Sequence, residues 1–188
     1  MRALAAVLFG SVVALSAIAE PAPQTAESAG AAQWKVDEFN FPYSGFTARY
    51  SCQGLRDTLR RVLLTLGARK EDLKVGYLSC GADSTRAQPY VSLKIHMARL
   101  VPATDAAPQE ALQAHWHAID LTREARLESG DCELQQQIES LLLKHFTTRN
   151  GDAHLSCPSH NLPTSAQAQR LEVLQQTLSS PAPSSDPH

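Results

Sequence analysis

The sequence predicts an α/β fold, an α+β two-layer sandwich in which a mixed β-sheet carries its helices on one face. Two stretches, 46–80 and 114–157, each read as a strand, a helix and a second strand. Each stretch has one cysteine between its first strand and its helix and another where its second strand ends, namely Cys52, Cys80, Cys132 and Cys157. Between them, residues 90–101 alternate apolar and polar side chains, which is typical of an antiparallel strand. The predicted order is therefore βαβ-β-βαβ, stapled by two disulfides.

Two periodicities predict the first unit. Apolar and polar residues alternate over 46–52, as on a half-buried strand. The helix that follows has apolar residues at three- and four-residue spacing, namely Leu55, Leu59, Val62, Leu63 and Leu66. Gly67 stands where a left-handed C-cap would end that helix, and the second strand covers 73–80.

The second unit shows the same order of patterns. A strand around 116–121 leads to a helix with Asp131 as its N-cap, and this helix carries the apolar stripe Leu134, Ile138, Leu141, Leu142 and Phe146. The last strand of the unit ends at Cys157. A further C-terminal helix is predicted over 164–178, because Leu171, Leu174 and Leu178 would share one helical face.

The first 19 residues have the features of a cleaved export signal. A basic start at Arg2 precedes an apolar run from Leu4 to Ile18, and Ala17-Ile18-Ala19 is a small-x-small cleavage pattern. The apolar run is short for a bilayer span, which needs ~20 residues. We therefore expect a periplasmic or secreted protein that starts at Glu20 and is not embedded in a membrane after cleavage.

Composition predicts one folded domain with unstructured ends. The leader at 20–33 is rich in Ala and Pro and the tail at 179–188 in Ser and Pro, so both are expected to be disordered. The domain between them covers 34–163, and its aromatic-rich start, 34–45, is expected to pack irregularly over the edge of the core. The formal net charge of −2 indicates no nucleic-acid partner.

Export favours disulfides for the four cysteines, because an oxidising compartment stabilises paired thiols. Four cysteines allow three pairings. We favour Cys52–Cys80 and Cys132–Cys157, since each bond would close one βαβ unit. One geometric alternative stays open: a strand inserted between the two parallel strands of a unit would separate the cysteines by ~10 Å, too far for a direct bond.

His115 and His117 are the best candidates for a metal site. Residues i and i+2 of a strand point to the same face, so these two imidazoles could share a copper or zinc ion in an exported protein. His96 is not expected to join them, because a simple hairpin places it ~13 Å away along the strand. Exposed or hydrogen-bonded histidines without metal are the alternative interpretation.

The motifs of common enzymes are missing from the sequence. There is no phosphate-binding glycine loop, GxSxG elbow, HExxH pair or dinucleotide fingerprint. We therefore assign no catalytic residue, and a small hydrolase is only the second alternative for function. The segments YSC, GDCEL, FTTRN and LSCP, between 46 and 158, resemble a group of small secreted proteins of Gram-negative bacteria with no assigned activity. This resemblance implies an exported bacterial protein and carries no functional residue.

The sequence thus favours a non-catalytic binding or interaction module of the cell envelope, with another envelope protein as the expected kind of partner and no cofactor. The alternative is a periplasmic metal-binding protein that uses His115 and His117.

Overall fold

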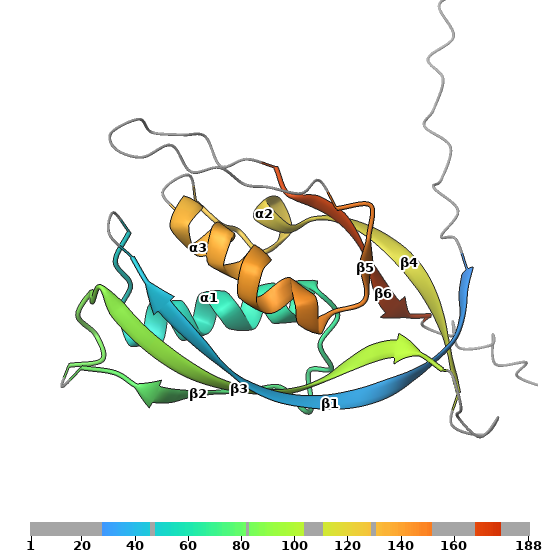
Figure 1. Cartoon of the computed structure of the whole chain (residues 1–188), viewed down its shortest axis with the longest axis horizontal. Helices are drawn as coiled ribbons and strands as arrows, with labels where there is room; N and C mark the ends of the chain where they lie inside the picture. The colour runs from blue at the N-terminus through green and yellow to red at the C-terminus, as the bar shows by residue number, and fades with distance from the viewer. Residues whose placement is uncertain are drawn as a thin grey trace, which may run out of the picture.

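The computed structural model describes residues 28–45, 48–81, 83–103, 111–128, 131–151 and 168–177. Within these ranges one six-stranded sheet has the order β2-β3-β1-β4-β6-β5 (Figure 1). The strands are β1 (Ser28–Ser44), β2 (Lys74–Ser79), β3 (Tyr90–Pro102), β4 (Leu112–Asp120), β5 (Thr148–Arg149) and β6 (Arg170–Gln176). The helices are α1 (Cys52–Thr65), α2 (Leu121–Glu124) and α3 (Cys132–Gln137), and α3 continues as a π turn (Ile138–Leu142) and a 3₁₀ turn (Leu143–His145).

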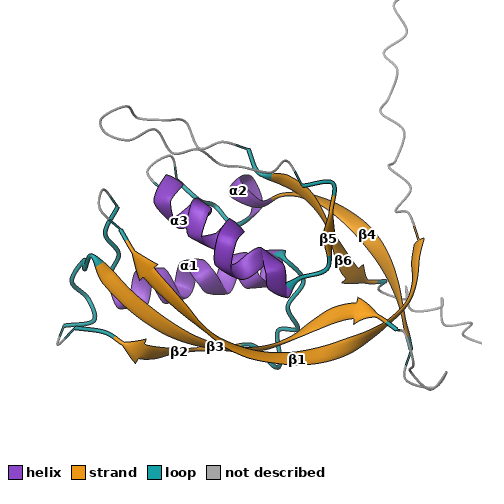
Figure 2. Cartoon of the chain, in the orientation of Figure 1, coloured by secondary structure: helices purple, strands orange, loops and turns teal. Residues whose placement is uncertain are grey.

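The chain forms two halves with the same order of elements, strand, helix, strand, strand. In the first half, β1 and β2 both pair antiparallel with β3, so they run parallel to each other with β3 between them. In the second half, β4 and β5 flank β6 in the same way. The halves are joined where β1 pairs with β4. Figure 2 shows the curved sheet wrapped around α1 and α3, which lie on its concave side.

The sheet is therefore antiparallel throughout, and the expectation of a mixed sheet was wrong. Each half does contain a strand, a helix and a parallel strand, as in a βαβ unit, but the first half uses β1 in place of the strand predicted at 46–52, the second half uses β5, and an inserted strand separates the parallel strands in each. The fold is α+β.

The long strand β1 corrects the predicted start of the domain. Residues 20–33 were expected to be disordered, but Ser28 to Ala32 pair with β4 on one edge of β1, and Ala32 to Ser44, which include the aromatic-rich stretch, pair with β3 on the other. The register with β3 runs without a break from Ala32 to Ser44. Because backbone groups on both edges find partners, weak strand propensity in this Ala- and Gly-rich segment does not prevent strand formation.

The core has two parts on opposite faces of the strands. The main core lies between the sheet and the helices, and in β1 and β3 it takes the odd-numbered residues Phe41, Tyr43, Val91, Leu93, Ile95 and Met97. A smaller cluster takes the even-numbered positions near the β1–β4 junction, namely Ala32, Leu100, Ala114 and Leu174, with Trp34 and Trp116 packed against it. Two-faced burial is consistent with period-2 alternation along each strand.

Local signals explain the limits of α1. Ser51 is its N-cap, and the Ser51 Oγ accepts a hydrogen bond from the Gly54 backbone N–H at 3.0 Å. Gly67 has φ +91° and ends the helix in a Schellman motif, in which Ala68 N–H donates to Leu63 C=O at 2.9 Å. The predicted strand over 46–52 was wrong where this region is described: Tyr50 makes a single bridge to Gln88, and Cys52 already belongs to α1.

The predicted C-terminal helix was also wrong over 170–176, because these residues form β6 against β4. Leu171 and Val173 face the main core, whereas Leu174 faces the smaller cluster. Burial on both faces removes the alternation that would indicate a strand, and the spacing of Leu171 and Leu174 fits a helix equally well.

The Cys52–Cys80 disulfide is present, with the two Cα atoms 6.1 Å apart. A strand, β3, is indeed inserted between the two parallel strands, but it does not keep the cysteines apart. Cys52 is the first residue of α1 and does not end a strand of the sheet, so β3 does not lie between the two sulfurs. Cys132 is not a free thiol, but Cys157 lies outside the described residues and the Cys132–Cys157 pairing stays a prediction.

The export signal 1–19, the expected strand at 152–157 and the tail 179–188 also lie outside the described residues. No helix in the described ranges has the length and apolar character needed to cross a bilayer.

Removing the Cys52–Cys80 bond should destabilise the protein by ~3–4 kcal/mol, because the bond closes a loop over a sequence separation of 28 residues. The double variant Cys52→Ala, Cys80→Ala should show this loss in urea denaturation followed by circular dichroism. A loss under ~1 kcal/mol would mean that the bond does not constrain the unfolded chain as that loop-entropy argument requires.

Candidate functional site

The outer edge of β2 is the most prominent exposed apolar feature of the described residues. β2 ends the sheet at one side, and its outward backbone edge has no partner strand within the described chain. Tyr77 and Leu78 on β2 are 43% and 56% exposed, and Tyr90 at the start of β3 is 52% exposed. The remaining large apolar side chain with such exposure is Val36, on β1, at 60%. We call β2 together with Tyr90 the β2 edge.

The unpaired backbone groups of the β2 edge could pair with a strand of another chain. An edge strand presents free N–H and C=O groups that can pair with an added strand. Natural edges are protected by charges and bulges, and the β2 edge has both: Lys74 at its start and a register shift between Tyr77 and Ser79. The regular register with β3 is thus limited to Lys74–Tyr77, with Leu78 at the irregularity.

The α1 helix supports this edge. The guanidinium carbon of Arg56 lies 5.5 Å from the centroid of the Tyr77 ring, a cation–π distance. Arg56 is itself held by Asp57, whose Oδ1 accepts a hydrogen bond from its Nη2 at 2.9 Å. The nearby Arg60 Nη1 donates to the backbone carbonyl of Leu73 at 3.3 Å, just before β2. The Tyr77 ring is therefore exposed to solvent but held in place by Arg56.

The disulfide and Gln88 fix the far end of the edge. Cys80 directly follows β2 and is bonded to Cys52, the first residue of α1. The Gln88 side chain accepts from Gly81 N–H at 2.9 Å and donates to Asp83 C=O at 3.0 Å, which ties together both sides of the loop between β2 and β3. Tethering at both ends lowers the conformational entropy that binding would cost.

His115 and His117 lie on one face of β4, as the alternation predicted. Their ring centroids are 6.1 Å apart and the rings are nearly perpendicular. His115 Nδ1 lies 3.4 Å from the hydroxyl of Thr177. Across the described ranges, no group of three His, Cys, Asp or Glu side chains could hold a metal ion. His96 lies apart on β3, where its Nδ1 is 3.7 Å from a carboxylate oxygen of Glu38.

A half-buried charged cluster, which sequence reasoning missed, joins β1, β3 and the end of the α3 segment. Arg99 Nε donates to Asp37 Oδ2 at 2.6 Å, and His145 Nδ1 lies 3.6 Å from the same oxygen. The His145 ring stacks on Phe39, with centroids 3.7 Å apart. A signal did exist: Asp37 and Arg99 occupy positions of the strand alternation that neighbouring residues fill with core side chains.

The electrostatics of this cluster favour a structural role. Burial would raise the pKa of Asp37, but the hydrogen bond and charge of Arg99 outweigh it and hold that pKa below its usual range. Burial also lowers the pKa of His145, and the charge of Asp37 offsets this only in part. The Asp37 carboxylate is thus committed to Arg99, which makes it a poor proton acceptor for catalysis.

Tyrosines and acidic residues lock the N-terminal end of α3 to the connection between β1 and α1. The Tyr50 hydroxyl donates to Asp131 Oδ1, and the Tyr43 hydroxyl donates to Ala48 C=O at 2.7 Å. Asp131 was predicted as a side-chain N-cap, but it makes no capping bond to the helix. Burial of the Tyr50 hydroxyl and its hydrogen bond to Asp131 raise the pKa of Tyr50 above its usual range. Tyr50 therefore stays a neutral phenol, and its contact with Asp131 holds the two halves together.

Comparison with protein-family models, with curated proteins and with solved structures finds no match to this chain. Function is therefore argued from the geometry alone.

We predict that stability falls as the pH drops from about 7.5 to 5. The pKa of His145 is lower in the folded protein than its ordinary 6.5, so the unfolded chain binds the proton first and the stabilisation is lost as pH falls through the folded pKa. Below pH 3.8, the lowered pKa of Asp37 adds a second loss. Urea denaturation at a series of pH values should show that the free energy of unfolding of the His145→Gln variant changes less with pH than that of the native protein.

His117→Gln is the matched control, since His117 is an exposed histidine on β4. It should leave the pH dependence unchanged. An identical slope in the His145→Gln variant and the native protein would contradict this account of the cluster.

Proposed function

We propose that this chain is an exported, non-catalytic interaction module that binds another protein of the cell envelope through its β2 edge. One observation carries the proposal: within the described residues, three of the four exposed large apolar side chains, Tyr77, Leu78 and Tyr90, gather at one end of β2 and β3. Exposed apolar residues that gather in this way mark interaction surfaces more often than the same residues scattered singly.

The kind of partner follows from the geometry. A strand edge recognises an extended segment through main-chain hydrogen bonds, and flanking side chains select alternate residues of that segment. The positioned Tyr77 ring and the exposed Leu78 favour apolar residues at the matching positions of the partner. The Cys52–Cys80 bond is compatible with a periplasmic or extracellular location.

Photo-crosslinking in the export compartment tests this proposal. A benzoylphenylalanine placed at Leu78 should give a discrete cross-linked product, and Tyr77→Lys in the same chain should reduce its yield. Loss of a central aromatic anchor costs ~2 kcal/mol or more of binding, roughly thirtyfold in affinity. Since Tyr77 is exposed, the substitution should change folding stability by less than about 0.5 kcal/mol.

Val36 supplies the control, because it is equally apolar and exposed but lies on β1, outside the edge. The photo-crosslinker at Val36 should give no such product. Equal yields from the two positions, or a yield at Leu78 that Tyr77→Lys leaves intact, would refute binding through the β2 edge.

Metal binding by His115 and His117 is the second candidate function. Their shared face and the 6.1 Å between ring centroids support it, and water or a bound molecule would have to complete the coordination. Calorimetric titration with Zn²⁺ and Cu²⁺ should show binding that the double variant His115→Ala, His117→Ala loses and His96→Ala keeps. Affinity that survives the double variant, or no binding by the native chain, would exclude this site.

A further inference from the structure

Two adjoining hollows lie where β4 ends, around α2 and β6. One has a volume of about 520 Å³ and is lined by residues that include Arg126, Leu127 and Glu128. The other, of about 430 Å³, includes Asn150, Arg170 and Glu172. Asp120 and Arg123 line both, so the two hollows adjoin. Volumes of this size suit small-molecule ligands.

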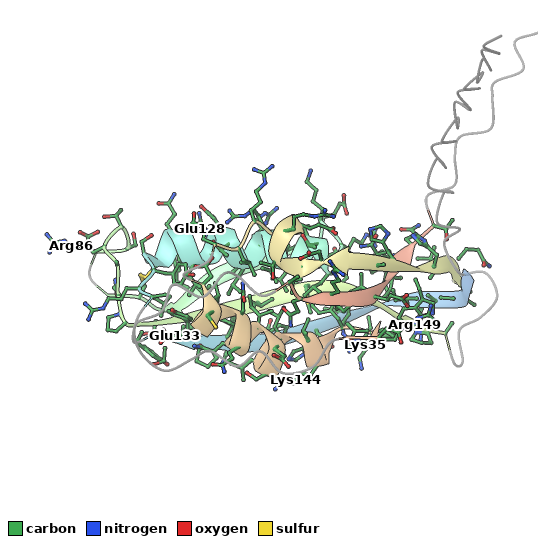
Figure 3. All side chains as sticks on the ribbon, turned by 90° about the horizontal axis from the view of Figure 1, so that it is seen from above. Lys35, Arg86, Glu128, Glu133, Lys144 and Arg149 are labelled. Carbon is green, nitrogen blue, oxygen red and sulfur yellow. A yellow bond between two sulfur atoms is a disulfide. The ribbon has the colours of Figure 1, made fainter. Side chains whose placement is uncertain are left out.

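Both hollows border α2, which Figure 1 shows on the opposite side of α1 from β2. Figure 3 shows Arg86, in the loop that follows β2, at the opposite end of the molecule from Arg149. Arg149 pairs with Glu172, a wall residue of the smaller hollow. A ligand in the hollows would therefore not touch the proposed protein-binding surface.

The cationic groups of the hollows are available. The guanidinium groups of Arg123, Arg126 and Arg170 have no hydrogen-bond or ion-pair partner within the described part of the chain. They come from three places, namely α2, the turn after α2 and the start of β6. An arginine fork binds a carboxylate with two parallel hydrogen bonds, so these groups could receive an anionic group of a ligand.

The acidic groups, in contrast, are held in place by the protein. Asp120 Oδ1 accepts from Arg123 N–H at 3.1 Å, and Glu124 Oε1 accepts from Asp120 N–H at 3.1 Å. Each of these carboxylates keeps a second oxygen that could accept from a ligand. The walls thus carry both signs of charge, which favours a ligand that is itself zwitterionic over a simple anion.

The backbone conformation of Arg126 is unfavourable for a residue with a side chain. It has φ +55° and occupies the C′ position of a Schellman motif, in which its own N–H donates to Arg123 C=O and Leu127 N–H donates to Thr122 C=O. The same motif ends α1, where glycine (Gly67) takes the left-handed position. A side chain is strained in that conformation, and local strain of this kind gathers at functional sites.

We propose that the two hollows together bind a small zwitterionic molecule of the amino-acid or short-peptide class. The carboxylate of the ligand binds the guanidinium groups of Arg123 and Arg126 or Arg170, and its ammonium group binds the outward oxygens of Asp120 and Glu124. Ile119, Leu127 and Leu171 border the hollows, but they are buried in the main core, so the charged groups make the main contacts with the ligand. This site is independent of the β2 edge, so either proposal can fail alone.

Titration of the ¹⁵N-labelled mature protein with the tripeptide Ala-Ala-Ala tests the proposal. Amide signals of Arg123, Arg126 and Arg170 should shift saturably, and amidation of the peptide C-terminus should weaken binding by at least about tenfold, since it removes a charge-assisted contact. Absence of shifts at 20 mM peptide, or equal binding of the amidated form, would overturn it.

Arg126→Gly separates a ligand contact from a structural role. Glycine relieves the strained φ, so the melting temperature should rise by about 2 °C, while affinity for Ala-Ala-Ala should fall by about tenfold. Arg86→Gly, at the far end of the molecule, is the control and should leave affinity unchanged. A variant at Arg126 that is stabilised yet binds normally would show that Arg126 is no part of the site.

Discussion

The fold depends on one strand that both halves of the chain share. β1 pairs with β3 from Ala32 to Ser44, and its first residues pair with β4, so it is the element through which the two halves form one sheet. The small side chains at this junction have a packing reason. Ala32 and Ala114 are fully buried there, together with Leu100 and Leu174, beneath the two tryptophans. Larger residues in place of the alanines would force the strands apart, since cores tolerate added volume poorly.

The two halves repeat one plan but differ where function is proposed. Each begins with a strand, continues through a helical segment and returns through two strands, and in each a cysteine opens the main helix, Cys52 in α1 and Cys132 in α3. The first half has β2 at the edge of the sheet, with a register shift near its end and exposed aromatic residues beside it. In the second half the helical segment is divided: α2 stops after four residues at the strained Arg126, and α3 passes through a π turn before its end. The β2 edge and the arginine-lined hollows thus arise from the departures of each half from their common plan.

The elements that could be predicted have their apolar residues on one face, which packs against the core. α1 follows from a single apolar stripe and β3 from alternation of apolar and polar residues, and Gly67 ended α1 as expected. The elements that were predicted wrongly are buried on both faces or paired on both edges. β6 buries Val173 on one side and Leu174 on the other, which hides its period, and the start of β1 gains its order from pairing on both edges rather than from its own propensity. The common face of His115 and His117 was predictable from a local rule. The Asp37–Arg99–His145 cluster joins three distant segments, so strand alternation could mark Asp37 and Arg99 as facing the core side but could not show that they pair with each other or with His145.

Hydrogen exchange of the protein tests the central role of β1 most directly. The amides of Ala31, Ala32 and Gln33 lie in the segment that composition predicts to be a disordered leader. In the structure Ala31 pairs with β4, Gln33 pairs with β3, and Ala32 pairs with both. If β1 joins the halves, protection of these amides should be of the same order as that of Ile95 in the middle of β3, because they should open only with the global unfolding of the sheet. Exchange at the rate of an unstructured chain at Ala31 to Gln33, with Ile95 still protected, would contradict the shared strand and leave the two halves without their common element.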